Sequence, residues 1–342
     1  MKTKGITIAD VARRAQVSQA SVSRYLNGIE GNLSTETAGR IQKAINDMGY
    51  RPNAWARSLK TQRSGLLAVV VPDLANSFVP AVLDGIEAAT NDAGFSLLIG
   101  NSQNDQMRES ALLDRLLQQR AEGIILQPTS DHVSEPLRAL VSEGVPVVLI
   151  DRLTHDELVL DMVGLDNRGA IRMAFEHLQA RGYRQIVYVT DPPDAVSSRH
   201  EREQAVLAHQ SAWGAVRLVV RTHNDPGALT SVLKEAVDIV PGGHTAVLCS
   251  NGMTALYALE AIRTIGYLVP GDLGMMMIDD PTWAPYVLGG ITSIAQPTFN
   301  LGNRAAQRLL NRIHHTVTKP LETRLPGQLM IRNSTMCPLR EE

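Results

Sequence analysis

Residues 7–27 read TIADVARRAQVSQASVSRYLN, and the pattern of this stretch predicts the structure of the first part of the chain. Its apolar residues recur at helical spacing in two short runs, with Val11 and Ala12 in the first run and Val22 and Leu26 in the second. A few polar residues separate the two runs. The pattern predicts two short amphipathic helices joined by a tight turn.

Hydrogen-bonding residues stand where the two helices must begin. Thr7 can cap the first helix, and Asp10 follows three residues later, where a capping box needs an acceptor. Gln16 and Val17 form the turn, and Ser18 can cap the second helix. This arrangement predicts a helix-turn-helix, whose second helix enters the major groove of DNA. The alternative is an ordinary helical hairpin on a protein surface.

The outer face of the second helix carries small or hydrogen-bonding side chains and one cation, namely Gln19, Ala20, Ser23, Arg24 and Asn27. A third helix is predicted over residues 35–48, capped by Ser34 and ended by Gly49. It would close a three-helix core over the first two.

The charge of the chain is divided between its two parts. Residues 1–63 hold 11 Lys and Arg against 4 Asp and Glu, whereas the whole chain has a net charge of −2. The remainder is therefore acidic. A basic head on an acidic body is expected when only the head meets phosphate.

Length and composition bound the class of protein. With 342 residues, of which 44% are hydrophobic, the chain is long enough for two or three domains with large cores. Its two cysteines, Cys249 and Cys337, have no metal-ligand spacing and make no disulfide framework. We find no signal peptide or apolar run long enough to span a membrane, and we expect a cytoplasmic protein.

From residue 65 onward, strands alternate with helices. The predicted strands cover residues 66–71, 95–99, 123–126, 146–149, 185–189, 217–220, 246–249 and 274–278. Helices are predicted between them, and a late helix over residues 299–314 would cross back over the first half. This alternation predicts an α/β body of two doubly wound parallel sheets with a cleft between them. Ligands of such sheets bind beyond the carboxyl ends of the strands.

Between head and body lies a short segment, NAWARSLK at residues 53–60, which is too small to have a core of its own. We therefore divide the chain into a helix-turn-helix domain (residues 1–50), a hinge helix and linker (51–64), and a bilobed effector-binding and dimerisation domain (65–342).

The chain resembles the lactose/galactose repressor (LacI/GalR) family of bacterial transcription regulators over nearly its whole length. The motifs that carry the resemblance are TIADVARRAQVSQASVSRYLNG, YRPNAWARSLKTQRSG, VVVPDLANSFVPAVLDGIE, VPVVLIDR, GLDNRGA, HLQARGYRQIVYV and ITSIAQPTFNLGNRAAQRLL. Their order and spacing make the resemblance specific. It implies a helix-turn-helix head on a body like a periplasmic binding protein.

The resemblance also implies roles in DNA binding. Base edges would be contacted by Gln19, Ala20 and Arg24, with Arg24 bidentate to guanine. Phosphates would be contacted by Thr7, Ser18, Ser23 and Asn27. The segment with Asn53, Ala56 and Leu59 matches the family's hinge helix, in which the leucine wedges into the minor groove. An ordinary buried leucine is the alternative for Leu59.

Eight residues match positions at which family members contact their effector: Phe78, Asp151, Arg152, Ser198, Arg199, Arg202, Asn251 and Asp279. Phe78 would stack on a sugar ring, and the Asp and Asn side chains would hold vicinal hydroxyls. Arg199 and Arg202, three residues apart on one helix face, suit a carboxylate better than a neutral sugar. We therefore expect a sugar acid of the ketogluconate type. Arg199 could instead pair with Glu203 and never meet the ligand.

Gly252 departs from the family, because many members carry Asp at this position after the Asn of Asn251. It leaves the fold expectation intact and puts the ligand in question.

Together these observations predict a homodimeric repressor, paired through first-lobe helices such as residues 108–119, that an effector releases from a palindromic operator. We expect no catalytic residue, metal or cofactor, and no membrane partner. Two alternatives are a doubly wound enzyme and a sugar-binding transport component. The chain lacks G-x-G-x-x-G after its first strand, a phosphate loop and a nucleophile elbow, which disfavours the enzyme. The basic head and the missing signal peptide disfavour transport.

Overall fold

The structure is a computed structural model that describes residues 6–26, 33–50, 64–155, 158–192, 196–213, 216–220, 227–242, 244–317 and 319–336. The chain divides into two compact units, residues 1–64 and residues 65–342. We call them the head and the body.

The head contains three helices, α1 (Ile8–Ala15), α2 (Gln19–Leu26) and α3 (Thr35–Met48). Thr7 and Asp10 form the predicted capping box, and the Ser18 hydroxyl accepts the backbone N–H of Ser21 at 3.1 Å. Their common core includes the fully buried Val11, Val22 and Ile41. The predicted helix-turn-helix closed by a third helix is thus present.

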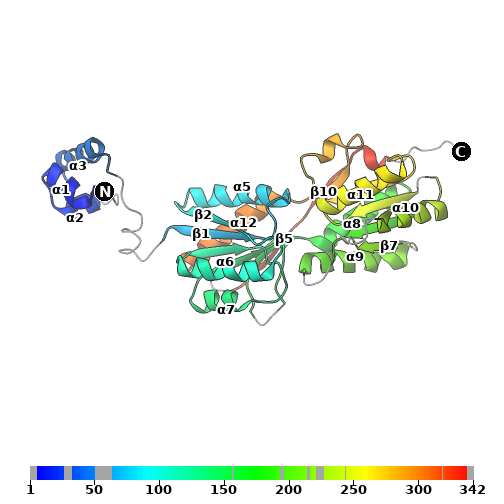
Figure 1. The fold of residues 1–342 in the computed structure, drawn as a ribbon, viewed down its shortest axis with the longest axis horizontal. Helices are drawn as coiled ribbons and strands as arrows, with labels where there is room; N and C mark the ends of the chain where they lie inside the picture. Colours follow the sequence, from blue (N-terminus) through cyan, green and yellow to red (C-terminus); the bar gives the residue numbers. More distant parts are fainter. Residues whose placement is uncertain are drawn as a thin grey trace. The chain divides into compact units, whose positions relative to one another are not determined.

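The first lobe of the body is a six-stranded parallel sheet. Its spatial order is β11 (Glu322–Leu325), β5 (Asp161–Leu165), β4 (Val147–Ile150), β3 (Gly123–Leu126), β1 (Leu66–Val71) and β2 (Ser96–Asn101). One face is covered by α5 (Phe78–Asn91) and α12 (Thr298–Ile313), and the other by α6 (Gln106–Gln118) and α7 (Glu135–Ser142) (Figure 1). Val69 and Val70 of β1 enter opposite cores, as successive strand residues must.

The second lobe repeats this plan. Its sheet runs β12 (Gln328–Met330), β10 (Thr292–Ala295), β9 (Gly274–Ile278), β8 (Thr245–Cys249), β6 (Gln185–Thr190) and β7 (Val216–Val220). One core includes residues of α10 (Ala228–Ile239) and α11 (Gly252–Ile265), and the other includes residues of α8 (Asn167–Ala180) and α9 (Ser197–Trp213). Only β12, among the described strands, is antiparallel to its neighbour.

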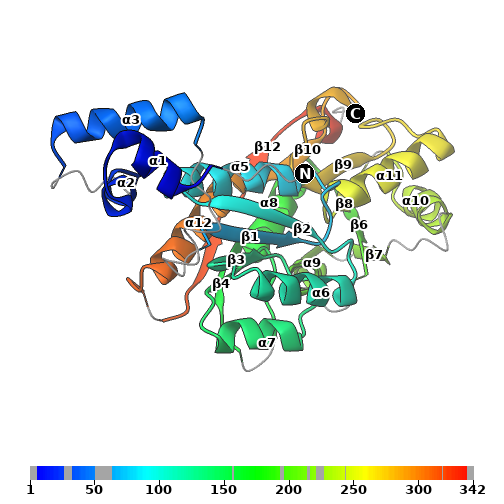
Figure 2. The same ribbon diagram turned by 60° about the vertical axis from the view of Figure 1, so that its left-hand side comes forward.

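The chain crosses between the lobes three times: from β5 to α8, from β10 to α12, and from β11 to β12. The second crossing returns α12 to the first lobe, where it lies beside α5, as predicted (Figures 1 and 2). Two glycines permit this contact. A Cβ on Gly85 would lie 2.0 Å from the carbonyl oxygen of Phe299, and one on Gly302 would lie 2.0 Å from that of Val82.

Four strands are not predicted from the sequence: β5, β10, β11 and β12. These are the strands that flank the three crossings, and two of them are short edge strands with polar residues, such as ETRL in β11. Such segments have no long apolar run, so they resemble loops. The two sheets are therefore not simply consecutive in the chain, because each is completed by strands from the C-terminal part.

Candidate functional sites: a DNA-reading helix and an interlobe pocket

The outer face of α2 is open to solvent in the head. Gln19, Ala20 and Arg24 are exposed, and Ser23 is half-buried. Ser18 lies at the helix start with its hydroxyl on the Ser21 N–H, and Thr7 bonds Asp10 at 2.7 Å through its own hydroxyl. Both hydroxyls therefore already serve as helix caps.

Other predicted DNA contacts lie outside the described residues, namely Asn27, Asn53, Ala56 and Leu59. Their roles stay predictions.

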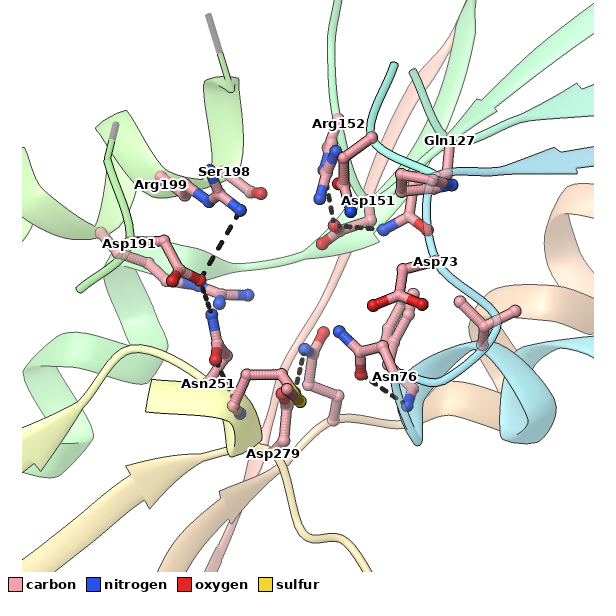
Figure 3. Close-up of a pocket in the computed structure, with 17 residues that line it drawn as sticks. Asp73, Asn76, Gln127, Asp151, Arg152, Asp191, Ser198, Arg199, Asn251 and Asp279 are labelled. Atoms are coloured by element: carbon pink, nitrogen blue, oxygen red, sulfur yellow. Dashed lines mark hydrogen bonds and ion pairs between the residues drawn. The ribbon is translucent and has the colours of Figure 1, made fainter. Parts of the chain in front are cut away.

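In the body, the eight predicted effector residues all line one pocket between the lobes (Figure 3). The pocket holds about 740 Å³ of space, including its open mouth. Strand ends and the helix starts after them supply its walls, as expected for open α/β sheets. At its rim the lobes touch, because the Ser197 hydroxyl accepts the backbone N–H of Leu153 at 2.6 Å.

The wall from the first lobe is built after β3 and β4. Gln127 donates to the Asp151 carboxylate at 2.9 Å, and Arg152 donates to the carbonyl of Pro128 at 2.9 Å. Asp151 and Arg152 are 3.7 Å apart, and Oδ1 of Asp151 and Nε of Arg152 are buried with no hydrogen-bond partner among the described residues. Two buried polar atoms that lack partners can bind a polar ligand.

In the second lobe, Asp191 organises the wall opposite. Its Oδ2 accepts the side-chain amide of Asn251 at 2.9 Å and lies 3.6 Å from the Arg199 guanidinium. Arg199 also donates to the carbonyl of Pro192 at 2.9 Å. These contacts direct Arg199 toward the pocket (Figure 3).

Arg202, 5% exposed, is held more tightly than Arg199. Its Nε donates to Asn167 and its Nη1 to the carbonyl of Ser250, both at 2.7 Å. Asp279 at the end of β9 accepts Gln296 at 2.6 Å and the N–H of Gly252 at 3.2 Å. Burial raises the pKa of the Asp279 carboxyl, and Arg202 and these two hydrogen bonds oppose the rise.

Three guanidinium groups gather at the pocket. The pKa of Arg152 is lowered to about 10, mainly by burial; the positive charges of Arg199 and Arg202 also lower it, while Asp151 and Glu109 oppose the shift. Arg152 therefore still carries its charge at neutral pH. A buried cation with cationic neighbours is stabilised by an anion, and guanidinium groups bind carboxylates in two-pronged geometry.

Nine further pocket residues are not predicted from the sequence: Pro72, Asp73, Asn76, Val79, Asn104, Gln127, Asp191, Met253 and Gln296. A signal is present for three of them, because Asp73, Gln127 and Asp191 each follow a predicted strand within two residues. Asn104 lies in the loop after β2, and a loop of this kind gives no separate signal.

Among the described residues, no helix is long and apolar enough to cross a membrane.

The head and the body each match a known protein family. Residues 7–53 match the family described as bacterial regulatory proteins, lacI family, and residues 175–335 match the periplasmic binding protein-like domain. The HTH-type transcriptional regulator PtxS of Pseudomonas aeruginosa is 38% identical over 96% of each chain. The HTH-type transcriptional regulator KdgR of Bacillus subtilis is 34% identical over 97% of this chain and 99% of its own.

Solved structures agree. The regulator CelR in its cellobiose complex is 28% identical, with a TM-score of 0.68 over 96% of this chain and 99% of that chain. The lac repressor dimer bound to operator and the anti-inducer ONPF has a TM-score of 0.82 over 97% of this chain and 100% of that chain, and at 24% identity it supports the fold alone. The predicted head and bilobed α/β body are confirmed, and the chain belongs to the lacI family of bacterial transcription regulators.

Proposed function

We propose that this DNA-binding regulator is a repressor that a sugar acid of the ketogluconate type releases from its operator. The acid binds in the interlobe pocket. Its binding favours one arrangement of the lobes over another. The change in DNA affinity is limited by the difference between the ligand's affinities for the two arrangements.

The observation that carries the proposal is the group of three arginines at one pocket. Arg152 enters from the first lobe, and Arg199 and Arg202 enter from α9 of the second lobe. A carboxylate between them would bond both lobes at once, which couples ligand binding to lobe closure.

The remaining polar groups suit a hydroxylated chain. Asp151, Asn251 and Asp279 stand at strand ends around the same space, and carboxylate and amide oxygens accept hydrogen bonds from vicinal hydroxyls. Phe78, at the start of α5, supplies an apolar face for a sugar ring, and Ser198 supplies a hydroxyl. CelR binds cellobiose, a neutral sugar. The arginine group favours an acid for the present pocket.

The head supplies the DNA contacts. Gln19, Ala20 and Arg24 read base edges, whereas Thr7, Ser18, Ser23 and Asn27 meet phosphates. The hinge segment after residue 50 adds Asn53, Ala56 and the Leu59 wedge. One short helix reads few base pairs, so two copies of the chain bind a pseudo-palindromic operator as a homodimer.

The protein acts by binding and not by catalysis, in the cytoplasm, where its DNA lies. Two features of the chain support this proposal: the solvent-facing α2 and a pocket whose Asp and Arg side chains are engaged with one another.

The test starts with selection of the operator from random DNA by the full-length protein. We expect the selected sites to be pseudo-palindromic, and ketogluconate, but not glucose, to release the protein from them. Arg202→Gln should bind the operator as tightly as wild type and fail to respond. Release by glucose with no effect of any sugar acid would contradict the ligand class. Sustained turnover of an acid by the protein would contradict a purely regulatory role.

A further inference from the structure

The three crossings between the lobes converge on Gly327, in the turn from β11 to β12. A Cβ at Gly327 would lie 2.5 Å from Cγ2 of Ile294, and 3.4 Å from both the carbonyl oxygen of Ala295 and Cδ1 of Leu165. Leu165 ends the first crossing strand and Ala295 ends the strand before the second crossing. The turn therefore lies close to the strands that precede the first and second crossings.

A chain of side-chain hydrogen bonds leads from the pocket to the same junction. Arg202 donates from Nε to Oδ1 of Asn167 at 2.7 Å, and Asn167 donates from Nδ2 to Oε2 of Glu201 at 2.6 Å. Both Glu201 oxygens accept Arg324, at 2.6 and 3.0 Å. Arg324 stands on β11 and also donates to the carbonyl of Leu165 at 3.1 Å.

The chain passes from one lobe to the other. Arg202, Asn167 and Glu201 belong to helices of the second lobe, whereas Arg324 belongs to the edge strand of the first. Arg202 and Asn167 are 5% and 2% exposed, so water competes little for the first link. The Glu201–Arg324 pair is charged and bidentate, which fixes its geometry as well as its energy.

We infer that Asn167, Glu201 and Arg324 form a relay that couples the position of Arg202 in the pocket to the crossing strand β11. When an anion draws the Arg202 guanidinium, the displacement passes through Asn167 to the carboxylate that anchors Arg324. The three residues are positioning residues, because none of them lines the pocket. The identity of the anion rests on the proposed function. The coupling between Asn167 and β11 does not, because it needs no ligand.

An ion pair that lies wholly within the second lobe provides a matched control for the Glu201–Arg324 pair, which joins the two lobes. Arg332 donates to both oxygens of Asp280 at 2.6 and 2.8 Å, with side-chain exposure of 16% against 22% for Arg324. Its other bonds, to the carbonyl of Ile291 and the hydroxyl of Ser293, stay within the second lobe. Loss of this pair should cost similar stability without touching the crossing at β11.

The first test needs no ligand. Hydrogen exchange of the full-length protein is compared for wild type, Asn167→Ala and Arg332→Met. Asn167 hydrogen-bonds Glu201 and Arg202, and the residue before it, Asp166, donates its backbone N–H to Leu325 at 2.8 Å, so a local role would loosen α8, α9 and the end of β11 at Leu325. The relay predicts that Asn167→Ala also speeds exchange at residues 322–324 at least threefold, whereas Arg332→Met does not. Unchanged exchange at residues 322–324 in Asn167→Ala would overturn the relay.

The second test separates ligand binding from the response, with ketogluconate as the probe. Glu201→Gln keeps the shape of the side chain and removes its charge. We expect its dissociation constant for the probe, measured by calorimetry without DNA, to stay within about threefold of wild type. The concentration that releases half of the operator should rise at least tenfold. Equal shifts in both quantities would overturn the relay as a coupling device.

The two tests also separate this inference from the proposed function. If wild-type protein gives no heat with ketogluconate, the proposed ligand class fails, and the exchange experiment alone decides on the relay.

Discussion

Asp151 and Asp279 occupy equivalent positions in the two lobes. Each follows a strand at the same place in its sheet, β4 or β9, and each has a positive φ, 65° and 78°. Each donates its backbone N–H to the next strand, to Val163 at 2.9 Å and to Ile294 at 3.1 Å. The Asp151 carboxylate accepts a hydrogen bond from the side chain of Gln127, and the Asp279 carboxylate accepts one from Gln296.

This equivalence explains why aspartate suits both positions. Asp tolerates the left-handed region better than most residues, and its short side chain turns back toward the strand end. Both carboxylates line the same pocket, and the charge of Asp151 contributes to the raised pKa of Asp279. A ligand with hydroxyls on two opposite sides would donate one hydrogen bond to Asp151 of the first lobe and another to Asp279 of the second.

Asp279→Asn tests the buried carboxylate. Because burial raises its pKa in the folded state above the usual 3.8, the folded state binds the proton more readily than the unfolded state. The contribution of Asp279 to stability therefore declines as pH rises from about 4 through the raised pKa. The variant lacks this contribution, so its unfolding midpoint at pH 7 should equal or exceed that of wild type, and the difference should vanish near pH 4. An Asn variant that is less stable at every pH would show that the carboxylate is net stabilising.

Replacing an arginine should discriminate between acid and neutral ligands. Each charge-assisted hydrogen bond is worth about 1.5–3 kcal/mol, or roughly 10- to 100-fold in affinity. Arg199→Gln should therefore weaken ketogluconate binding at least tenfold in a calorimetric titration, because Arg199 lines the pocket and reaches Asp191. Glu203→Gln is the control. If Arg199 paired with Glu203 and never met the ligand, the two variants would have the same affinity for ketogluconate.

The crossing of α5 and α12 predicts two destabilising variants. An added methyl at Gly85 or Gly302 meets a backbone carbonyl at 2.0 Å, and backbone cannot rotate away. Overpacking of this kind costs about 1–3 kcal/mol, and more where backbone must move. Gly85→Ala and Gly302→Ala should each lower the unfolding midpoint of the body. Gly39→Ala on exposed α3, with nothing within 4 Å, should not lower the midpoint of the head.

The head predicts a difference between base and phosphate contacts. Arg24→Ala removes an exposed guanidinium from α2 and should relax the choice of base at one operator position, costing about 1–3 kcal/mol there. Ser23→Ala should weaken binding to all sites alike. Binding to a set of single-base operator variants measures both, and an even loss across the set for Arg24→Ala would contradict base reading.

The sequence was most informative where apolar residues follow a single pattern, either a continuous run or helical spacing, along a whole segment. Strand β1 and helix α3 begin and end where predicted, because a long apolar run stops at Pro72 and a helical stripe stops at Gly49. The eight predicted pocket residues come from the resemblance to the family, and their place beyond strand ends fits the rule that parallel strands bring their carboxyl ends to one edge.

Other features depend on contacts between distant segments. Strand β11 is polar, and it becomes a strand by pairing with β5, some 160 residues earlier in the chain. The bond from Arg202 to Asn167 likewise joins two helices, and no local pattern marks it. The strand end before Asp191 marks its place near the pocket, but its contacts depend on Asn251 and Arg199, which reach it from another loop and from α9.

The most direct measurement is thermal unfolding of the full-length protein against ketogluconate, gluconate, glucose and glucose 6-phosphate. A ligand that binds the folded state raises the midpoint in proportion to the logarithm of its concentration over its dissociation constant. We predict a concentration-dependent rise with a sugar acid in wild type and none in Arg202→Gln. A rise with glucose alone, equal in wild type and Arg202→Gln, would contradict the arginine-bound acid on which the account rests.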